Sequence, residues 1–235
     1  MDSLQRRSKP IQKGSNALFH AKDPGSALTH FIGFCAAVFA TPLLLIHASS
    51  HGADTAAMRS LTIFMLSMTL LYGASTSYHT LDLTPAANKR LKKIDHIMIF
   101  VLIAGSYTPF CTLVLRGERG HLLLVTVWAI AVAGMLLKAF WVTCPKWFSS
   151  VIYIAMGWAC ISNIPALFGA LSGGQFALLL AGGLIYTAGG VIYALKFTVF
   201  GGRFRYFGSH ELFHVFVMAG SVCHYLALWN YVGML

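Results

Sequence analysis

Two short motifs place three histidines where a single metal ion could bind them. His210 and His214 are four positions apart, and in a helix this spacing puts both imidazoles on one face. Ser75 and His79 show the same spacing at the end of an earlier apolar run. Imidazole nitrogen is a common zinc ligand, and three protein ligands with one open position are the usual layout when zinc activates water. We therefore expect His79, His210 and His214 to bind Zn²⁺.

Two further residues have the chemistry to complete such a site. Ser75 lies one helical turn from His79 and could hydrogen-bond a metal-bound water, while Asp95 could accept the proton of that water. A carboxylate at a helix N-terminus is also favoured by the helix dipole alone. We assign Asp95 and Ser75 as the candidate catalytic residues and regard the dipole as the competing explanation for Asp95.

The motif around the last two histidines also matches a metalloprotease signature. In His210-Glu211-x-x-His214 the glutamate would be the general base. A residue next to a ligand points about 100° away from it around a helix, however, and we find no peptide-binding edge strand in the sequence. A membrane protease is therefore an alternative that we rank below the three-histidine site.

The composition predicts that these residues lie within a membrane. Of the 235 residues, 57% are hydrophobic and only 10% are charged, and the mean hydropathy is +0.70. A helix needs roughly 20 apolar residues to cross the hydrocarbon layer. The expected fold is an all-α bundle of seven transmembrane helices, and the runs of this length are residues 27–47, 56–80, 94–115, 121–141, 148–171, 176–200 and 210–232.

The chain before the first run is basic and polar. We expect residues 1–26 to form a cytoplasmic tail without a cleaved signal peptide, and residues 27–235 to form one transmembrane domain. Asp23 and Pro24 predict a helix cap followed by proline in the first turn. Pro109 should bend the third helix, where Ser106 and Thr108 can hydrogen-bond freed carbonyls.

The lysines and arginines predict the orientation. Fourteen of the 17 precede the first run or lie at the same expected side, and Arg59, Arg116 and Arg119 lie at the other. Basic residues favour the cytoplasmic side. The N-terminus should be cytoplasmic and the C-terminus extracytoplasmic, with the protein a multi-pass component of a bacterial inner membrane.

The remaining charged, histidine and cysteine residues suggest no second function. The net charge is +10, and the basic residues lie at the ends of the expected helices without interleaved aromatic residues. We therefore expect contacts with anionic lipid and no nucleic-acid binding. Five cysteines without a C-x-x-C pair indicate packing rather than disulfides. His224 should lie inside the bundle or in the outer leaflet and His96 should face a neighbour or the interface, and the expected interfacial anchors are His20, His30, His47, His51 and His121.

Taken together, the motifs resemble the hemolysin III branch of the progestin and adipoQ receptor family, which includes the adiponectin receptors. The resemblance extends over nearly the whole chain. It is carried by Thr29-His30-x-Ile32-Gly33, by Ser75-Thr76-Ser77-Tyr78-His79, by Asp95-His96-x-x-x-Phe100 with Ala104-Gly105-Ser106-Tyr107-Thr108-Pro109-Phe110, and by Gly208-Ser209-His210-Glu211-Leu212-Phe213-His214-x-Phe216.

The resemblance implies seven helices, an intracellular N-terminus and zinc held by His79, His210 and His214 near the cytoplasmic side. Asp95 would then act through water, and Ser75 would stand nearby. The adiponectin receptors carry glutamine at the position of Glu211, which argues against an essential base there. The N-terminal tail lacks the large intracellular region of the animal receptors, so hormone reception is not implied.

The family and the wider alkaline ceramidase-like superfamily imply hydrolysis of lipid amides or esters, and bacterial relatives imply a part in membrane lipid homeostasis. Our leading hypothesis is a zinc-dependent hydrolase that takes a fatty acid or acyl lipid sideways between its helices. One alternative is a lipid sensor with structural zinc, and another is a pore-forming hemolysin. The sequence does not indicate the oligomeric state.

Overall fold

The computed structural model describes residues 21–195 and 207–235, and within these ranges the chain is helical without strands. Seven helical segments are long and apolar enough to span a membrane. The predicted seven-helix bundle is therefore confirmed. The expected tail up to residue 20, His20, and the end of the sixth run at residue 200 lie outside the described residues.

In the part of the chain that the structure describes, eight α-helices build the seven spans, because the fifth span is divided. A π-helical turn follows the third helix, and a 3₁₀ turn η2 (Ile161–Asn163) lies within the fifth span. The elements in chain order are α1 (Pro24–Ser50), α2 (Thr55–Thr80), α3 (Pro85–Pro109) with η1 (Phe110–Leu115), α4 (Gly117–Phe140), α5 (Lys146–Gly157), α6 (Ile164–Ala170), α7 (Gly173–Leu195) and α8 (Ser209–Val232).

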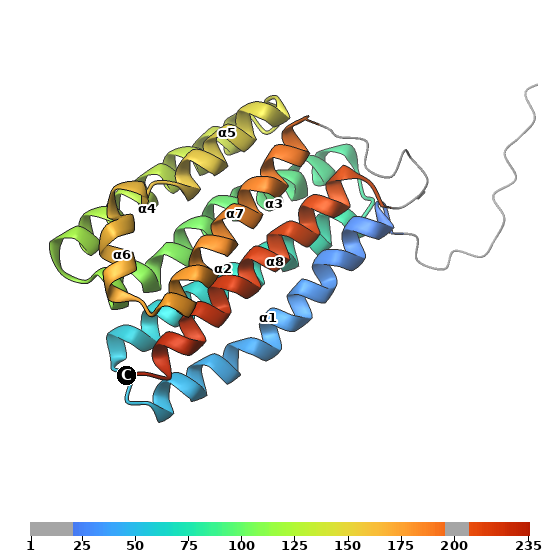
Figure 1. The fold of residues 1–235 in the computed structure, drawn as a ribbon. Helices are drawn as coiled ribbons and strands as arrows, with labels where there is room; N and C mark the ends of the chain where they lie inside the picture. Colours follow the sequence, from blue (N-terminus) through green and yellow to red (C-terminus); the bar gives the residue numbers. More distant parts are fainter. Residues whose placement is uncertain (1–20, 196–206) are drawn as a thin grey trace, which may run out of the picture.

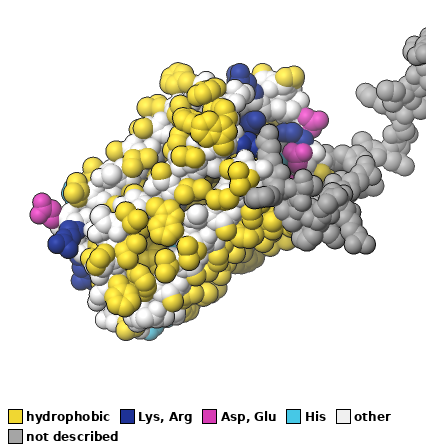
Figure 2. All heavy atoms as spheres, turned by 45° about the horizontal axis from the view of Figure 1, so that its top comes forward, with side chains coloured by type: hydrophobic (Ala, Val, Ile, Leu, Met, Phe, Trp, Pro, Cys, Tyr) yellow, Lys and Arg dark blue, Asp and Glu magenta, His cyan; other side chains and the backbone are white. Residues whose placement is uncertain are grey.

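The helices run side by side, with α2 between α1 and α3 and with α8 between α7 and α1 (Figure 1). We call the end at which α1 and α8 begin and α2 ends the histidine end. Hydrophobic side chains cover most of the face in Figure 2, and charged side chains gather toward its two ends. This distribution fits an apolar band facing lipid, as the composition predicts.

Helix α3 begins at Pro85, nine residues before the expected start of this span. Thr84 caps the helix by accepting a hydrogen bond from the Ala87 amide, and Pro85 occupies the first turn. The stretch after Pro85 is rich in lysine, so hydropathy alone excluded it from the predicted third span. Asp95 consequently lies well inside α3, and the helix dipole no longer explains its presence.

The sequence predicts a bend at Pro109, and in the structure α3 ends at this residue and continues as a π-helical turn. The Thr108 hydroxyl donates to the Ala104 carbonyl at 2.9 Å, and the Ser106 hydroxyl donates to the Ile103 carbonyl at 2.8 Å. The ring of Pro109 frees the carbonyl of Gly105, which lies four residues earlier. The two hydroxyls therefore bond the carbonyls one and two residues before the freed carbonyl, and not the freed carbonyl itself.

The fifth span is broken between α5 and α6, whereas the sequence predicted one continuous helix. Pro165 in the first turn of α6 cannot continue a preceding helix. The Tyr107 hydroxyl compensates, because it donates to the Gly157 carbonyl at 2.5 Å and accepts from the Cys160 amide at 3.2 Å. A tyrosine of α3 thus satisfies backbone groups that the break leaves open.

The histidines expected at the interface have different environments. His51 and His121 are exposed, as expected, and His47 stacks on Trp229 with 3.9 Å between ring centroids. For His30 the prediction is wrong, because its side chain is 3% exposed and lies inside the bundle. Helix α1 turns His30 toward α8, where a second imidazole covers it.

Lys138 was counted as an interfacial charge, but its side chain is 1% exposed. The ammonium donates to the Cys144 thiol at 3.0 Å and to the Ser149 hydroxyl at 2.6 Å. Burial by itself raises the pKa of the Cys144 thiol, but the hydrogen bonds from Lys138 and Ser149 outweigh it and lower that pKa below its usual value. Cys144 is therefore more than a packing residue.

We expect Cys144 to react with iodoacetamide faster at neutral pH than an ordinary thiol, because its lowered pKa leaves more thiolate. Lys138→Met should slow this alkylation by about threefold or more at pH 7, and the difference should vanish at high pH, where both thiols are ionised. Mass spectrometry of the Cys144 peptide gives the rates, with Cys223 as the internal reference. Equal rates in the two proteins at pH 7 would show that Lys138 does not lower the pKa of the Cys144 thiol.

Candidate metal centre

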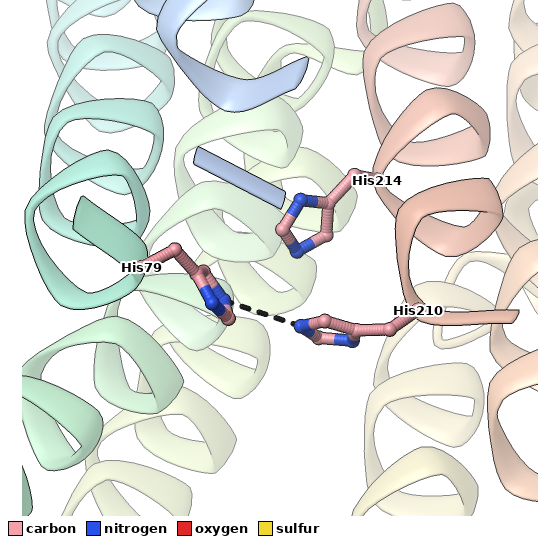
Figure 3. A group of neighbouring side chains, drawn as sticks. All are labelled: His79, His210 and His214. Atoms are coloured by element: carbon pink, nitrogen blue, oxygen red, sulfur yellow. Dashed lines mark hydrogen bonds between the residues drawn. The ribbon is translucent and has the colours of Figure 1, made fainter. Parts of the chain in front are cut away.

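The structure brings His79, His210 and His214 together at the histidine end of the bundle (Figure 3). One nitrogen from each ring lies within 4.8 Å of the other two. His79 comes from the last turn of α2, and the other two come from the first turns of α8. Residues 131 positions apart therefore meet because α2 ends where α8 begins.

The spacing of the nitrogens fits a tetrahedral zinc ion. Zinc–nitrogen bonds of about 2.1 Å at tetrahedral angles separate two ligand nitrogens by about 3.4 Å. The Nε2 atoms of His79 and His210 are 3.2 Å apart. The rings of His210 and His214 have centroids 4.5 Å apart and those of His79 and His214 5.3 Å. The donor set and its compactness fit zinc with only small side-chain shifts.

The far nitrogen of His79 is held by a carboxylate. Its Nδ1 lies 3.0 Å from the Asp23 carboxylate. The Asp23 amide also donates to the His79 carbonyl at 2.8 Å, which fixes the start of α1 against the end of α2. A carboxylate on the second nitrogen orients the ring and directs Nε2 toward the metal. Asp23 stands at the predicted N-cap position, but its side chain makes no capping hydrogen bond and bonds His79 instead.

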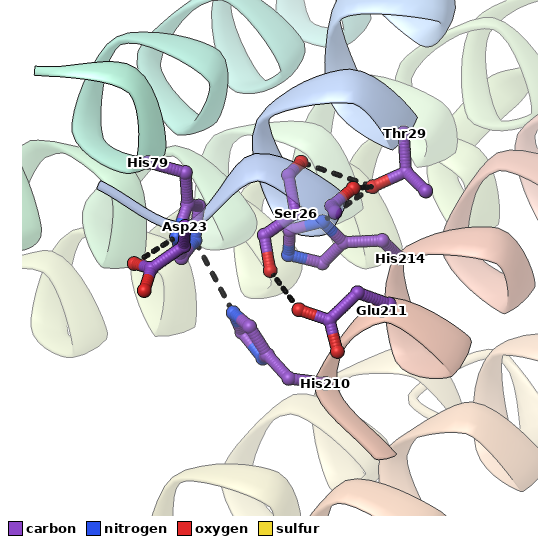
Figure 4. Close-up of polar contacts among 8 residues, drawn as sticks. Asp23, Ser26, Thr29, His79, His210, Glu211 and His214 are labelled. Carbon is purple, nitrogen blue, oxygen red and sulfur yellow. Dashed lines mark hydrogen bonds and ion pairs between the residues drawn. The ribbon is translucent and has the colours of Figure 1, made fainter. Parts of the chain in front are cut away.

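The far nitrogen of His214 has a hydroxyl partner. The Thr29 Oγ1 lies 3.1 Å from Nδ1 of His214, and the same hydroxyl group reaches the Ser26 carbonyl at 2.9 Å. Thr29 therefore links α1 to α8 and leaves Nε2 of His214 for the site. His210 differs, because its buried Nδ1 has no hydrogen-bond partner among the described residues. Two of the three imidazoles are thus oriented by α1 (Figure 4).

Glu211 is engaged in fastening helices rather than in facing the metal centre. Its carboxylate accepts a hydrogen bond from the Ser26 hydroxyl and another, at 2.8 Å, from the Gly208 amide (Figure 4). The second contact is the glutamate half of a capping box at the start of α8. These partners account for Glu211 structurally, so we do not carry the protease alternative further.

Asp95 and Ser75 are buried near the three histidines but are not members of their nitrogen cluster. The Asp95 side chain is 7% exposed, and the Ser75 hydroxyl is one of the polar groups that influence its carboxylate. That hydroxyl makes no complete hydrogen bond with any described residue. Asp95 lines the same interior cavity as His210 and His214, whereas Ser75 is fully buried one helical turn before His79. Their catalytic roles remain predictions.

Two histidines that the sequence analysis placed elsewhere also belong to this region. The His30 ring stacks on that of His214 with centroids 3.6 Å apart and planes 7° apart. His96 was expected at a neighbour or the interface, and it lines the interior cavity with Asp95 and His30. In the sequence, His30 stands out only as part of the family motif Thr29-His30-x-Ile32-Gly33. The spacing of residues in α1 does not determine which face of this helix points into the bundle.

A pocket with about 1140 Å³ of empty space, its opening included, lies inside the bundle next to the metal centre. Its lining includes His210 and His214 at one end and His224 toward the other. A second cavity of about 680 Å³ shares His224, Tyr107 and Trp158 with the first and continues between apolar side chains. The break between α5 and α6 borders both cavities. Together they form a largely apolar space, and two of the three clustered histidines, His210 and His214, contribute to its lining.

Seven spans and a cluster of three histidines at one end define a membrane protein with a candidate intramembrane metal centre. A family model described as "Haemolysin-III related" matches residues 20–225. The chain is 36% identical to Hemolysin-3 of Bacillus cereus over 214 aligned residues. These residues make up 91% of this chain and 93% of that protein. The chain belongs to the haemolysin-III-related family of multi-pass membrane proteins.

Two further relatives show the breadth of this family. The Hemolysin-3 homolog of Bacillus subtilis (strain 168) is 37% identical over 206 residues, which are 88% of this chain and 92% of that protein. The human monocyte to macrophage differentiation factor is 24% identical over 176 residues, or 72% of this chain and 69% of that protein. The resemblance noted in the sequence is thus confirmed at the level of the family.

Replacing Asp23 should weaken metal binding without removing a ligand. Asp23→Asn keeps the size of the side chain but loses the charge that supports His79, and loss of such a partner typically costs about 10- to 100-fold in affinity. Competition between the purified protein and a zinc-chelating dye measures this change. Asp54→Asn is the matched control, because Asp54 caps α2 at the opposite end. Equal zinc affinity in Asp23→Asn and the wild type would show that this contact has no role at the metal centre.

Proposed function

We propose that this protein is a zinc-dependent hydrolase of acyl lipids, cleaving an amide or ester bond, and that it acts in membrane lipid homeostasis. The observation that carries the proposal is that two of the three clustered imidazoles, those of His210 and His214, line a mainly apolar cavity. A metal site of this kind activates water, and such a cavity accepts an acyl chain.

The side chains divide the chemistry between them. His79, His210 and His214 would hold the zinc ion, with Asp23 and Thr29 keeping two of the rings in position. When bound, zinc would lower the pKa of a coordinated water and polarise the lipid carbonyl. Asp95 accepts a proton and returns it to the leaving group, which is the ordinary task of a buried carboxylate beside such a site. Ser75 orients the reacting groups by hydrogen bonding.

The cavity sets the class of substrate. Its walls include Leu102, Ile103 and Val217, and Asp95 lines the cavity together with His210 and His214. An acyl chain buried along these walls would gain roughly 0.8 kcal/mol for each methylene. The scissile carbonyl then lies at the polar end, next to the metal centre. A ceramide, an N-acyl amine or a phospholipid has this combination of a long chain and a carbonyl.

The test is the release of fatty acid by the purified protein in lipid nanodiscs loaded with zinc. Ceramide, an N-acyl amine and a phospholipid are supplied separately, and free fatty acid is measured by mass spectrometry. We expect turnover of one class, with loss of turnover in His79→Ala. Absence of product from every class, in protein shown to contain zinc, would contradict the hydrolase proposal.

A second function, a lipid sensor with structural zinc, is favoured by one observation. The metal centre joins α1, α2 and α8, because Asp23 and Thr29 of the α1 region bond two of the histidines. A metal that cross-links three helices can stabilise one conformation without turning over a substrate. Chelation would then lower the thermal stability while no lipid is cleaved. We do not extend the proposal to pore formation, because the interior walls are mainly apolar.

A further inference from the structure

His224 places an imidazole in the middle of the apolar interior, far from the metal centre. It lies ten residues beyond His214 on α8, which corresponds to about 15 Å along the helix. Its side chain is 8% exposed, and it lines both interior cavities. The ring is therefore located where the two cavities meet.

The position of this ring is tightly fixed by its neighbours. A Cβ atom added at Gly182 of α7 would come within 2.5 Å of Cδ2 of His224, so only glycine leaves room for the imidazole. The rings of Tyr186 and Phe110 contact it edge-on, with centroids 5.3 and 5.8 Å away. The imidazole cannot swing out of the cavity without clashing with these groups.

Neither ring nitrogen of His224 makes a complete hydrogen bond with a described residue. The Leu179 carbonyl lies toward the ring but outside hydrogen-bonding geometry. A buried polar group without a partner destabilises the folded protein, so its presence calls for an explanation.

The polar groups around His224 are occupied by one another. The Ser221 hydroxyl bonds the Tyr72 hydroxyl at 2.7 Å and the Tyr186 hydroxyl at 2.8 Å. Ser106, which lines both cavities, donates to the Ile103 carbonyl. These bonds leave His224 as a polar group directed at the cavity while the neighbouring hydroxyls are satisfied within the protein.

We propose that His224 is a recognition site for a hydroxyl group carried partway along the acyl chain of the ligand. A neutral imidazole offers one donor and one acceptor, and a hydroxyl group can satisfy either of them. The proposal rests on the proposed function, because it takes an acyl chain to occupy the cavity. It adds that the preferred chain is hydroxylated about 15 Å from the metal centre along α8.

The experiment compares 12-hydroxyoctadecanoate with octadecanoate as competitors of a fluorescent fatty acid bound to the full-length protein in nanodiscs. We expect the wild type to prefer the hydroxylated chain by about tenfold, the factor typical of a buried hydrogen bond. His224→Leu should bind the two chains equally, and His224→Gln should recover part of the preference. Phe176→Leu, on the wall of the second cavity, is the control and should change both affinities by the same factor.

The outcomes separate this inference from the proposed function. If the wild type binds both chains equally well, His224 does not recognise a hydroxyl, and the acyl-lipid proposal stands without it. If neither chain binds, the proposed function fails and the inference fails with it. A preference that persists in His224→Leu, with a thermal unfolding temperature equal to that of the wild type, would assign the recognition to another residue and overturn the inference.

Discussion

Replacing Asp95 by asparagine should abolish the release of fatty acid while leaving the zinc content unchanged. Asp95 is buried beside Ser75 on the cavity wall and is not one of the three clustered ligands. Asparagine has nearly the same shape but cannot accept a proton, and loss of a general acid–base group costs about 10²- to 10⁴-fold in rate. The rate of hydrolysis and the zinc stoichiometry are measured on the same preparation.

The control for this variant is Asp82→Asn. Asp82 lies in the exposed connection before α3, where its carboxylate accepts a hydrogen bond from Asn88. Its replacement should leave the rate of hydrolysis unchanged. If Asp95→Asn hydrolyses lipid as fast as the wild type, Asp95 is not the proton acceptor, and the structural-zinc alternative gains weight.

Replacing His210 by alanine should lower the affinity for zinc by more than about a hundredfold. A site with three protein ligands loses a full metal bond when one imidazole is removed, which is a larger change than loss of a supporting partner. A chelator should lower the unfolding temperature of the wild type, because a metal bound only to the folded state stabilises it. The variant should show no such response.

Two histidines provide controls for this second variant. His121→Ala removes an exposed imidazole at the start of α4, far along the chain from the metal centre, and should leave zinc binding intact. His30→Ala removes the ring stacked on His214 and should have an intermediate effect. Zinc binding by His210→Ala at wild-type affinity would show that the cluster does not hold the metal.

Much of the fold could be predicted because lipid imposes a strict length and polarity on each span. The seven runs were found from hydropathy, and the four-residue spacing of His210 and His214 placed both rings on one face. The convergence with His79 followed from the alternation of spans alone. The orientation of the bundle in the membrane remains a prediction from the distribution of lysine and arginine.

Other features depend on contacts that no local pattern encodes. Asp23 and His79 are 56 residues apart, and Thr29 and His214 are 185 apart. The sequence around Asp23 and Pro24 has the form of a helix cap, and this local interpretation concealed the contact with His79. The burial of His30 and of Lys138 likewise depends on the rotation of α1 and α4 against their neighbours, which hydropathy does not determine.

The break in the fifth span has a consequence for the cavity. Pro165 and the 3₁₀ turn before it interrupt the helix, and Trp158 at the interruption borders both cavities. In a continuous α-helix the side chains at this position would follow the regular spacing of about 1.5 Å per residue. The interruption therefore shapes the region in which His224 meets the proposed acyl chain.

The central claim is that three imidazoles share one zinc ion, and X-ray absorption at the zinc edge of the purified protein tests it directly. The account predicts about one zinc per chain, bound by three histidine nitrogens at about 2.0–2.1 Å and by one oxygen ligand. The same measurement on His210→Ala should show no ordered zinc. A wild-type spectrum with sulfur ligands, or protein that takes up no zinc when the metal is supplied in excess, would contradict the claim.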